Sequence, residues 1–427
     1  MLRLLYLSDI HFEEPGCLAP RTDTASNERK LLIEDLQTIV EDSDKRVDAI
    51  LVTGDITFKA HIDEFKTATA WLKKIADING IDESRIFVVP GNHDVDRNIA
   101  DNDVLASVRE RLDRKSEPGK KQEFLKSLQG DRTRELMLEP MQNYNNFAKQ
   151  YDCDIELPDK PFWTHHIPIN DKYKLCINGL TTTFFSNSND NHRTLYLGEF
   201  QAYLDNEVGV VNLAMFHHPK DWLSDGDRLD DLLADNAQIW LSGHKHRQRY
   251  TTDNRYLDLP SAAVNPSEWE PGLSGYNIID ISVSESDDYA SLELVVMMRN
   301  LQETPKQYVA KKTHEREDEL RHSIKIPKVA SSEQQAALVK VPTNNSNSKN
   351  EVNEACVEAT QEYRNLTRRL WDLQASKRRN IISLLNIEVE SDPLTDEERF
   401  IRQALEKIKK ENLLDDFEKL IIDQEKV

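Results

Sequence analysis

The feature that most constrains the fold of this chain is the alternation of short apolar runs with helical patterns in its N-terminal part. Leu2–Ser8, Val47–Thr53 and Arg85–Val89 are apolar runs of strand length. Between them, Glu28–Val40 and Phe65–Ile78 carry apolar residues at helical spacing. Strands separated by helices pair in parallel, because a helical crossover returns the chain to the same end of the sheet. The order predicts an α/β layered fold.

Residues 101–160 depart from this pattern because they are helical and densely charged, and we interpret them as an insertion rather than core. Further strands follow the insertion. Beyond Tyr250 they come without intervening helices, and we expect these late strands to complete a second sheet. The expected strands are Lys174–Leu180, Val210–Phe216, Ile239–Ser242, Tyr256–Leu259, Tyr276–Val283 and Ser291–Met298.

Composition limits the class of protein. The 427 residues, 38% of them hydrophobic, allow a large domain and a smaller one. No run of 18 or more apolar residues occurs, so we expect no transmembrane helix and no membrane association. The start, MLRLLYLSDIHF, lacks the order of a secretory signal. Four cysteines without a CxxC pair favour free thiols in a reducing cytoplasm.

The charge balance is strongly acidic, with 55 Lys and Arg against 76 Asp and Glu and a net charge of -21. Such a surface repels a polyphosphate backbone over most of its area, which disfavours a nonspecific DNA-binding protein. A small anionic substrate still binds if metal ions supply local positive charge.

Residue types that ligate metals follow five of the apolar strands. Because the carboxyl ends of strands in layered α/β folds meet at one crevice, five loops would deliver Asp, His and Asn side chains to one place. Each element alone is weak, since an isolated Asp-x-His or Gly-Asp is more often a surface or turn feature. Together they are specific. The elements are Asp9-Ile10-His11, Gly54-Asp55, Gly91-Asn92-His93-Asp94, His217-His218-Pro219 and Gly243-His244-Lys245-His246.

The spacing within these elements suits metal binding. Alternate residues of an extended loop point the same way, so Asp9 and His11 can share one ion, as can His244 and His246. Carboxylates and imidazoles bind first-row divalent cations. Asp55 could bridge two ions about 3.5 Å apart, the usual separation in two-metal sites.

The ordered series DxH, GD, GNHD, HHP and GHKH resembles the calcineurin-like metallophosphoesterase superfamily over about residues 1–300. The resemblance implies a four-layer αββα sandwich and two divalent ions, manganese first, with iron, zinc, nickel or cobalt as alternatives. It also implies the ligand sets. Asp9, His11, Asp55 and His246 would hold one ion, and Asp55, Asn92, His217 and His244 the other.

The resemblance implies a mechanism as well. A hydroxide that bridges the ions attacks phosphorus in line. His93 matches the family's catalytic histidine, which stabilises the developing charge and protonates the leaving oxygen, and Asp94 matches the residue that orients it. The alternative for His93 is a structural turn residue.

The sequence indicates the substrate less clearly than it indicates the metal-binding residues. The runs LSDIHF and VVPGNHDVDR are most similar to bacterial phosphodiesterases of the cyclic-nucleotide class, and similar loops occur in nucleases. Phe12, Lys59, Arg97, His218 and the pair His165-His166 either contact substrate or have structural roles. A basic cluster in the insertion either guides nucleic acid or, since acidic residues interleave, forms a solvated helix. It comprises Arg109, Arg111, Arg114, Lys115, Lys120, Lys121 and Lys126.

The C-terminal part has a different character. We expect a metallophosphoesterase domain at 1–310, a connector and flexible linker at 311–350, and a small helical bundle at 351–427. Thr395–Glu398 fits a capping box. The ending faintly resembles death-like adaptor bundles of bacterial conflict systems, which implies a protein partner; a packing or dimerisation appendage is the alternative. A basic stretch contains Arg368, Arg369, Lys377, Arg378 and Arg379.

These observations favour a two-metal phosphodiesterase that acts on a nucleotide or nucleic acid. The alternatives are a metal-dependent DNA or RNA nuclease of a bacterial defence system, and a nucleotide-sensing scaffold that acts through residues 351–427. A protein phosphatase is disfavoured because nothing marks a docking groove.

Overall fold

The computed structural model describes residues 1–329 except 20, 22, 116, 205–206 and 267–271, together with parts of the C-terminal segment. Those parts are residues 370, 375–385, 387, 389, 400, 403–405, 407–408 and 413–425. The chain divides into two compact units, Met1–Glu333 and Gln334–Val427.

The first sheet has seven strands in the order β12-β11-β10-β1-β2-β3, with β13 also paired to β11. The N-terminal strands β1, β2 and β3 are parallel, as the helical crossovers require. The remaining pairs are antiparallel. The bounds are β1 Leu2–Leu7, β2 Ala49–Val52, β3 Ile86–Val88, β10 Gly275–Glu285, β11 Ala290–Glu303, β12 Lys306–Ala310 and β13 Leu320–Ile326.

The second sheet has six strands in the order β4-β5-β6-β7-β9-β8. Its four central strands, β5, β6, β7 and β9, are parallel. The bounds are β4 Trp163–Pro168, β5 Lys174–Gly179, β6 Val210–Phe216, β7 Ile239–Ser242, β8 Thr251–Thr252 and β9 Leu257–Pro260.

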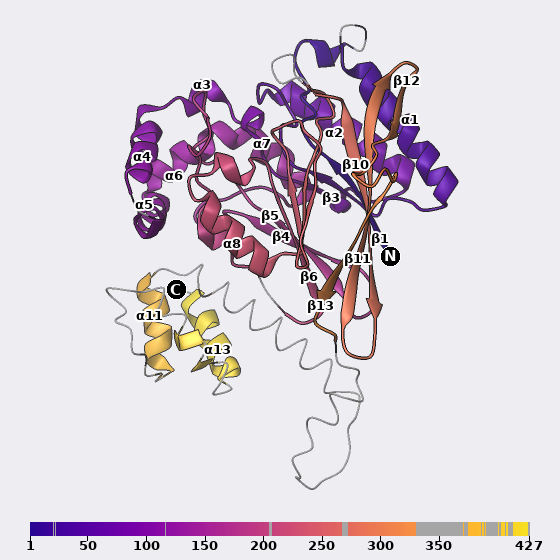
Figure 1. Cartoon of the computed structure of the whole chain (residues 1–427). Coiled ribbons are helices and arrows are strands. Elements are labelled where there is room, and N and C mark those ends of the chain that lie inside the picture. Colours follow the sequence, from indigo (N-terminus) through magenta and orange to yellow (C-terminus); the bar gives the residue numbers. More distant parts are fainter. Residues whose placement is uncertain are drawn as a thin grey trace. The chain divides into compact units, whose positions relative to one another are not determined.

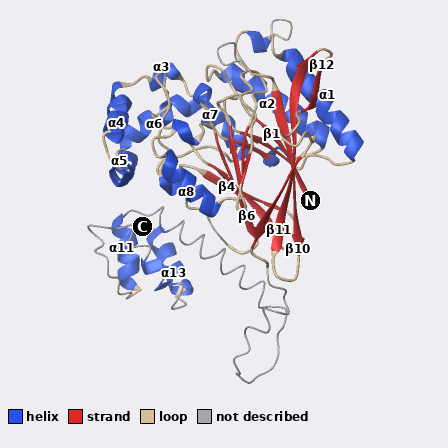
Figure 2. Cartoon of the chain, in the orientation of Figure 1, coloured by secondary structure: helices blue, strands red, loops and turns tan. Residues whose placement is uncertain are grey.

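The two sheets pack face to face, and helices cover their outer sides (Figures 1 and 2). Helices α1 (Ser26–Ser43) and α2 (Ile62–Asn79) flank the first sheet, and α8 (Gly226–Asn236) flanks the second. The alternation along β6 shows the layering, because Met215 joins the core between the sheets while Phe216 packs in the cluster with α8. The predicted four-layer αββα sandwich is confirmed.

One prediction about the sheets was wrong. The strands β10 and β11 lie in the first sheet, where β10 pairs with β1 and Ile279 lies opposite Leu4. Of the three late strands, β9 alone joins the second sheet. Alternating apolar residues define a strand but carry no information about which free sheet edge it will join, so the error has a physical cause.

The helical segment before β4 also differs from its expected character. Although densely charged, it buries Val108, Phe124 and Tyr144 in the same core cluster as the first sheet. The charged residues occupy the outer faces of amphipathic helices and obscure the apolar stripe in the sequence. The helices are α3 Arg97–Ala100, α4 Asp103–Asp113, α5 Glu117–Gln129, α6 Asp131–Leu138 and α7 Gln142–Ala148.

The first unit extends past the expected boundary at residue 310, because β13 pairs with β11. Most of the expected linker at 311–350 lies outside the described residues, as do Thr395–Glu398, Arg368 and Arg369. The described C-terminal residues include helices α11 (Ala375–Leu384) and α13 (Leu414–Glu425). They share a core of their own, with Leu370, Ile381, Ile382, Ala404, Leu405, Ile408, Phe417 and Ile421 buried.

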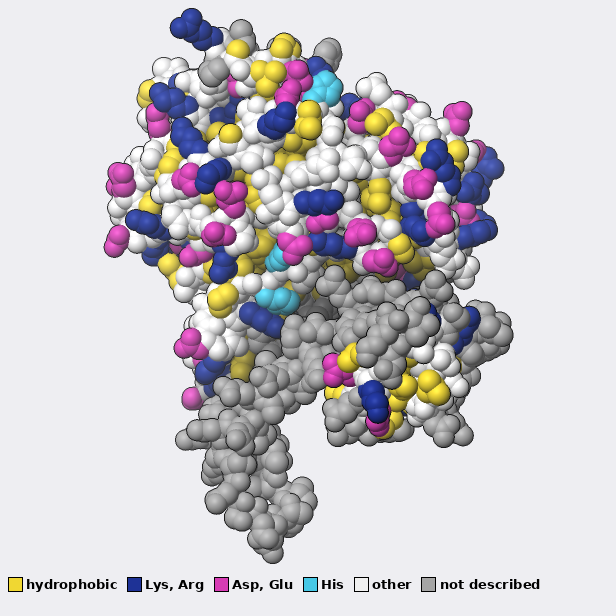
Figure 3. All heavy atoms as spheres, turned by 180° about the vertical axis from the view of Figure 1, so that it is seen from behind, with side chains coloured by type: hydrophobic (Ala, Val, Ile, Leu, Met, Phe, Trp, Pro, Cys, Tyr) yellow, Lys and Arg dark blue, Asp and Glu magenta, His cyan; other side chains and the backbone are white. Residues whose placement is uncertain are grey.

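Within the described parts of the chain, no helix combines the length and apolar character needed to cross a membrane. The face shown in Figure 3 carries basic and acidic side chains interspersed over the described surface rather than one broad basic patch.

Candidate metal centre

The seven side chains predicted as ligands lie together at the carboxyl ends of strands from both sheets. The loops after β1, β2 and β3 carry those of the first sheet, and the loops after β6 and β7 carry those of the second. All seven residues are buried: Asp9, His11, Asp55, Asn92, His217, His244 and His246.

Asp55 and Asn92 lie at the centre of the cluster. Oδ2 of Asp55 is 3.2 Å from Nε2 of His217 and 3.4 Å from Nε2 of His11. Oδ1 of Asn92 is 3.1 Å from Nε2 of His217 and 3.1 Å from Nδ1 of His244. Asp55 therefore borders ligand atoms from both predicted sets, as a bridging carboxylate must.

Asp9 lies on the other side of Asp55. Its Oδ1 is 3.2 Å from Nε2 of His246, and candidate ligand atoms of Asp9, His11 and His246 all lie within 4.8 Å of one another. The same limit holds for Asp9, Asp55 and His217. The structure thus brings both predicted ligand sets into one cluster.

The histidine hydrogen bonds show that the cluster fits cations. Nδ1 of His217 lies 2.7 Å from the carbonyl of Thr53, and Nδ1 of His11 lies 3.0 Å from the carbonyl of Asn265. A carbonyl accepts only, so Nδ1 is the donor in both rings and Nε2 is the nitrogen left facing Asp55. The Nε2 atoms and the carboxylate oxygens then converge on one region. This is how metal-binding histidines are usually fixed, and a divalent cation fits the gap.

The backbone of the ligand loops is unusual. Asp9, His11, Asp55, His244 and His246 all have positive φ, between 49° and 68°. They are five of the ten described non-glycine residues in this conformation, which costs free energy and gathers at functional sites. Packing is also tight there, since a Cβ on Gly91 would lie 2.2 Å from Oδ1 of Asp55.

Electrostatics keep the carboxylates ionised. Burial acts to raise the pKa of Asp9, but the imidazoles of His246 and His217 outweigh it and lower that pKa to about 2. Burial likewise opposes ionisation of Asp55, yet His217 and His93 bring its pKa well below the usual value. For His217, burial lowers the pKa and Asp55 raises it more, to about 9. The anionic oxygens attract positive charge, which a metal ion can supply in place of a proton.

His93 is positioned by groups that the sequence did not reveal. Its Nδ1 donates to the carbonyl of Phe58 at 2.8 Å, its ring stacks on that of Phe58 with centroids 4.7 Å apart, and its backbone N–H donates to Oδ1 of Asp55 at 2.7 Å. Its Nε2 lies 3.4 Å from Nη2 of Arg97. Burial lowers the pKa of His93 to about 4.

Asp94 has a different set of partners from the one expected. Its carboxylate accepts from the N–H groups of Gly91 and Thr57 at 2.9 Å, from the Thr57 hydroxyl at 2.9 Å and from the N–H of Ile56 at 3.2 Å. Burial and the charge of Asp55 raise the pKa of Asp94 to about 6. Asp94 ties the loops after β2 and β3 together, whereas the ring of His93 is held by Phe58.

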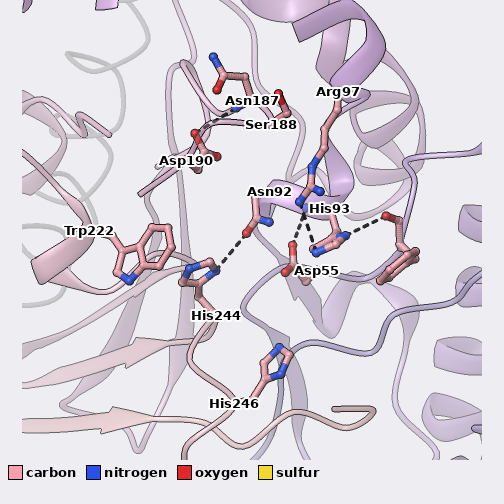
Figure 4. Close-up of a pocket in the computed structure, with 11 residues that line it drawn as sticks. Asp55, Asn92, His93, Arg97, Asn187, Ser188, Asp190, Trp222, His244 and His246 are labelled. Atoms are coloured by element: carbon pink, nitrogen blue, oxygen red, sulfur yellow. Dashed lines mark hydrogen bonds between the residues drawn. The ribbon is translucent and has the colours of Figure 1, made fainter. Parts of the chain in front are cut away.

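A pocket of 370 Å³ opens over the cluster (Figure 4). Asp55, Asn92, His93, His244 and His246 form its floor and side. Among the other wall residues, the sequence indicates only Arg97, because single polar or aromatic residues in loops carry no periodic signal. The remaining wall residues are Phe58, Arg97, Asn187, Ser188, Asp190 and Trp222.

The pocket wall around Asn187 is anchored by Arg109 of α4. The Arg109 guanidinium donates to the side chains of Asn187 at 2.9 Å and Asp190 at 3.2 Å, and to the carbonyls of Phe185 and Thr194. Arg109 therefore serves a buried structural purpose rather than a basic surface. Other members of the basic cluster pair with acids, Arg111 with Glu123, Arg114 with Glu110 and Lys121 with Glu199, which favours the solvated-helix interpretation.

The other flanking candidates lie outside the pocket wall. Phe12 is buried in the core, and Lys59 pairs with Glu13 at 3.0 Å. His218 is buried, with Nδ1 2.9 Å from the Thr182 hydroxyl. The pair His165-His166 lies within β4 rather than before a strand, and neither lines the pocket.

Residues 2–248 match the model of the calcineurin-like phosphoesterase family, and the chain belongs to this family. The family uses divalent metal ions and acts on phosphate esters. A curated relative, the uncharacterized metallophosphoesterase-like protein YydB of Bacillus subtilis (strain 168), is 24% identical over 287 residues. The aligned region covers 63% of this chain and 54% of the relative, so the chain spans about half the relative's length.

Solved structures with a similar arrangement share little sequence. GAP50, the anchor in the inner membrane complex of Plasmodium, is 14% identical with a TM-score of 0.39, and the match covers 81% of this chain and 98% of that one. A putative 5'-nucleotidase from Staphylococcus aureus is 11% identical with a TM-score of 0.35, and the match covers 78% and 57%.

Proposed function

We propose that this phosphoesterase hydrolyses a phosphodiester of a nucleotide or nucleic acid with two divalent metal ions. The observation that carries the proposal is the convergence of seven buried electron-pair donors from five loops, with two histidines fixed by backbone carbonyls. Asp9, His11, Asp55 and His246 would hold one ion, and Asp55, Asn92, His217 and His244 the other. Mixed oxygen and nitrogen ligands suit manganese first, with iron, zinc, nickel or cobalt as alternatives.

When bound, the two ions would lower the pKa of a water and stabilise charge on phosphoryl oxygens. The chain's own polar groups complete the site. Arg97 is an exposed guanidinium on the pocket wall, suited to paired hydrogen bonds with phosphate oxygens. His93 lies beside it, with Nδ1 held by Phe58 and Nε2 directed to the side of Arg97, where Nε2 can donate to an ester oxygen when it carries a proton.

The size of the pocket supports a nucleotide-sized substrate. Its 370 Å³ lies within the range of small-molecule sites, and a second open space adjoins it. A diester carries two organic substituents on phosphorus, and two adjoining spaces accommodate both. This arrangement supports a phosphodiester over a monoester.

The test compares two aspartates with the same backbone conformation. Asp55 and Asp44 both have φ of 50°, but Asp44 is an exposed residue at the end of α1. Asparagine tolerates this conformation, so Asp55→Asn and Asp44→Asn should both fold. With Mn²⁺ and bis-p-nitrophenyl phosphate, we expect Asp55→Asn to lose activity by about a thousandfold or more and Asp44→Asn to match the wild type.

The same proteins report on metal uptake. At a metal concentration of about 100 times Kd, binding should stabilise the wild type by about 2.7 kcal/mol, measured as a rise in Tm. Asp55→Asn should lose most of this rise. Undiminished turnover by Asp55→Asn, or a wild type that takes up no divalent ion, contradicts the proposal.

A metal-screened panel of cyclic nucleotides, single- and double-stranded DNA and RNA distinguishes the phosphodiesterase from a defence nuclease. Tight nucleotide binding without turnover under every metal would instead indicate a nucleotide-sensing scaffold. We propose that residues 351–427 recruit a protein partner, because the described part of this segment has its own core. We also propose a cytoplasmic location, supported by Cys17, Cys153 and Cys176, which are buried and not joined in disulfides.

A further inference from the structure

A groove of 730 Å³ adjoins the metal pocket. Trp222 and His244 line both spaces, so the groove leads directly to the candidate metal centre. Its other walls come from the segment before α8 and from the chain that follows β7. A substrate held at the metals can therefore extend into this groove without leaving the protein surface.

The acidic side chains of the groove all lie in ion pairs. Four aspartates line it and pair with three cations of the same wall, because Lys220 pairs with two of them. With Arg247 and Arg249 included, five cations and four carboxylates line the groove, an excess of one positive charge. The pairs are Lys245 with Asp221, Arg193 with Asp227, and Lys220 with both Asp230 and Asp258.

Two arginines in the groove remain without such a pair. Arg247 and Arg249 are exposed, and no carboxylate of the described residues forms an ion pair with either. Burial lowers the pKa of Lys311, and nearby Arg249 lowers it further, which indicates positive potential around Arg249. In a chain of net charge -21, a local excess of cations beside the metal centre marks an anion-binding surface.

The chain after β7 divides its residues between the two spaces. His246 and Gln248 are buried, and His246 lies beside Asp9, whereas the intervening Arg247 and the following Arg249 are exposed. One segment therefore presents a candidate metal ligand, His246, inward and two cations outward. The position of the arginines relative to the ligands is therefore fixed by the backbone itself.

Trp222 supplies an aromatic surface where the two spaces meet. Its ring lies 4.0 Å from that of His244 between centroids, at an interplanar angle of 79°, and 5.0 Å from that of the exposed His192. Proteins that bind single-stranded nucleic acid combine a positively charged groove with aromatic rings on which bases stack. This groove has both elements.

We infer that the groove binds a single-stranded nucleic acid on one side of the scissile phosphate, with Arg247 and Arg249 against backbone phosphates and Trp222 against a base. The inference rests on the proposed function, because the strand lies beside the same metal centre. It selects a polynucleotide over a cyclic mononucleotide, which has no further phosphate for the arginines. We do not expect a double helix to bind in this way, because its bases are already stacked on one another and are unavailable to Trp222.

The test measures binding rather than turnover. A labelled single-stranded oligonucleotide of about ten residues is titrated into the full chain in the presence of a chelator, and anisotropy is followed at several salt concentrations. We expect R247E/R249E to weaken binding by about tenfold or more and to reduce the slope of log affinity against log salt by about 1.4, since each phosphate contact contributes about 0.7 for single strands. Trp222→Leu should also weaken binding, and Trp222→Phe should weaken it less because a stacking face remains.

A matched control carries the same change of charge elsewhere. Arg132 and Arg321 are exposed and pair with Glu135 and Glu319, so R132E/R321E alters the net charge equally but leaves the groove intact. This control should bind the oligonucleotide with the affinity of the wild type, apart from a small loss of affinity that comes from the change in net charge alone. Equal affinity and salt slope in R247E/R249E and R132E/R321E, with Tm showing both folded, overturns the inference.

The result is separable from the proposed function. A wild type that binds the oligonucleotide through the groove yet hydrolyses no diester with any metal contradicts the function and leaves the groove assignment intact. A wild type that hydrolyses bis-p-nitrophenyl phosphate while its oligonucleotide affinity is insensitive to Arg247 and Arg249 contradicts the groove assignment alone. DNA and RNA versions of the probe identify which strand is preferred.

Discussion

The two sheets make different contributions to the candidate metal centre. Loops of the first sheet carry the candidate oxygen ligands, Asp9, Asp55 and Asn92, together with the candidate imidazole of His11. The candidate ligands from loops of the second sheet are all imidazoles, His217, His244 and His246.

In the proposed ligand sets, each ion would be held by residues from both sheets. The carboxylates of one sheet meet the imidazoles of the other only where the sheets pack, as in the 3.2 Å contact between Asp55 and His217. A cation held there would join the two layers, so metal binding and the stability of the sandwich should be coupled.

The largest expected effect comes from the imidazole side. His217→Gln removes a lone pair that faces both Asp55 and Asn92, and we expect kcat/KM to fall by about a thousandfold, or about 4 kcal/mol. Activity on bis-p-nitrophenyl phosphate and the metal content per chain measure it. If the two sheets contribute jointly, the loss should resemble that of Asp55→Asn on the other sheet.

The adjacent His218 provides the control. It follows the same strand and is equally buried, but its Nδ1 contacts Thr182 and it forms no hydrogen bond to Asp55 or Asn92. His218→Gln should therefore retain more metal than His217→Gln. Full activity in His217→Gln, or equal metal loss in both variants, would contradict the proposal that His217 and the ligands of the first sheet hold metal jointly.

A second variant tests whether His93, in a loop of the first sheet, is a metal ligand. His93→Gln should lower kcat by about a hundredfold, or about 2.7 kcal/mol, because it removes an imidazole from the pocket wall. The metal content should be unchanged if His93 lies outside the ligand set. Since His93 also lies within 4.8 Å of His11 and Asp55 at its ligand atoms, a loss of metal would show that it coordinates an ion and would refute the assignment.

The smallest expected effect concerns the pocket wall around Asn187, which lies outside the loops that carry the candidate ligands. Arg109→Met removes five hydrogen bonds to the segment 185–194, and we expect KM to rise by about threefold to tenfold, or about 1 kcal/mol, with kcat less affected. Arg114→Met is the control, because Arg114 forms only an exposed pair with Glu110 and should cost little. An unchanged KM in Arg109→Met would show that this wall does not position the substrate.

Much of the parallel core was predictable from the sequence. The strands Val210–Phe216 and Ile239–Ser242 have the predicted bounds, because each is an apolar run with polar residues immediately after it. Residue type and position after a strand indicated the five candidate metal-binding loops, and the resemblance to the calcineurin-like metallophosphoesterases implied which seven residues are ligands. Their function as ligands stays a prediction until metal binding is measured.

Features that depend on contacts with residues distant in sequence could not be predicted. The strand β10 was assigned to the wrong sheet because its apolar alternation is compatible with either. Phe58 and Trp222 gave no signal, and Arg109 was noted only as a member of the basic cluster. Their importance lies in contacts with residues distant along the chain or, for Phe58, in a backbone carbonyl.

The sequence by itself determined which chemical groups this chain places after its strands, because the spacing of apolar residues and the residue types are local properties of the sequence. The tertiary structure alone decided that carboxylates from one sheet face imidazoles from the other and that two backbone carbonyls orient Nε2 of His11 and His217 toward Asp55. It also decided that arginines without an ion-pair partner among the described residues line a groove beside them. Those relations depend on the packing of two sheets and on the φ angles of the loops, which arise only when distant segments come together.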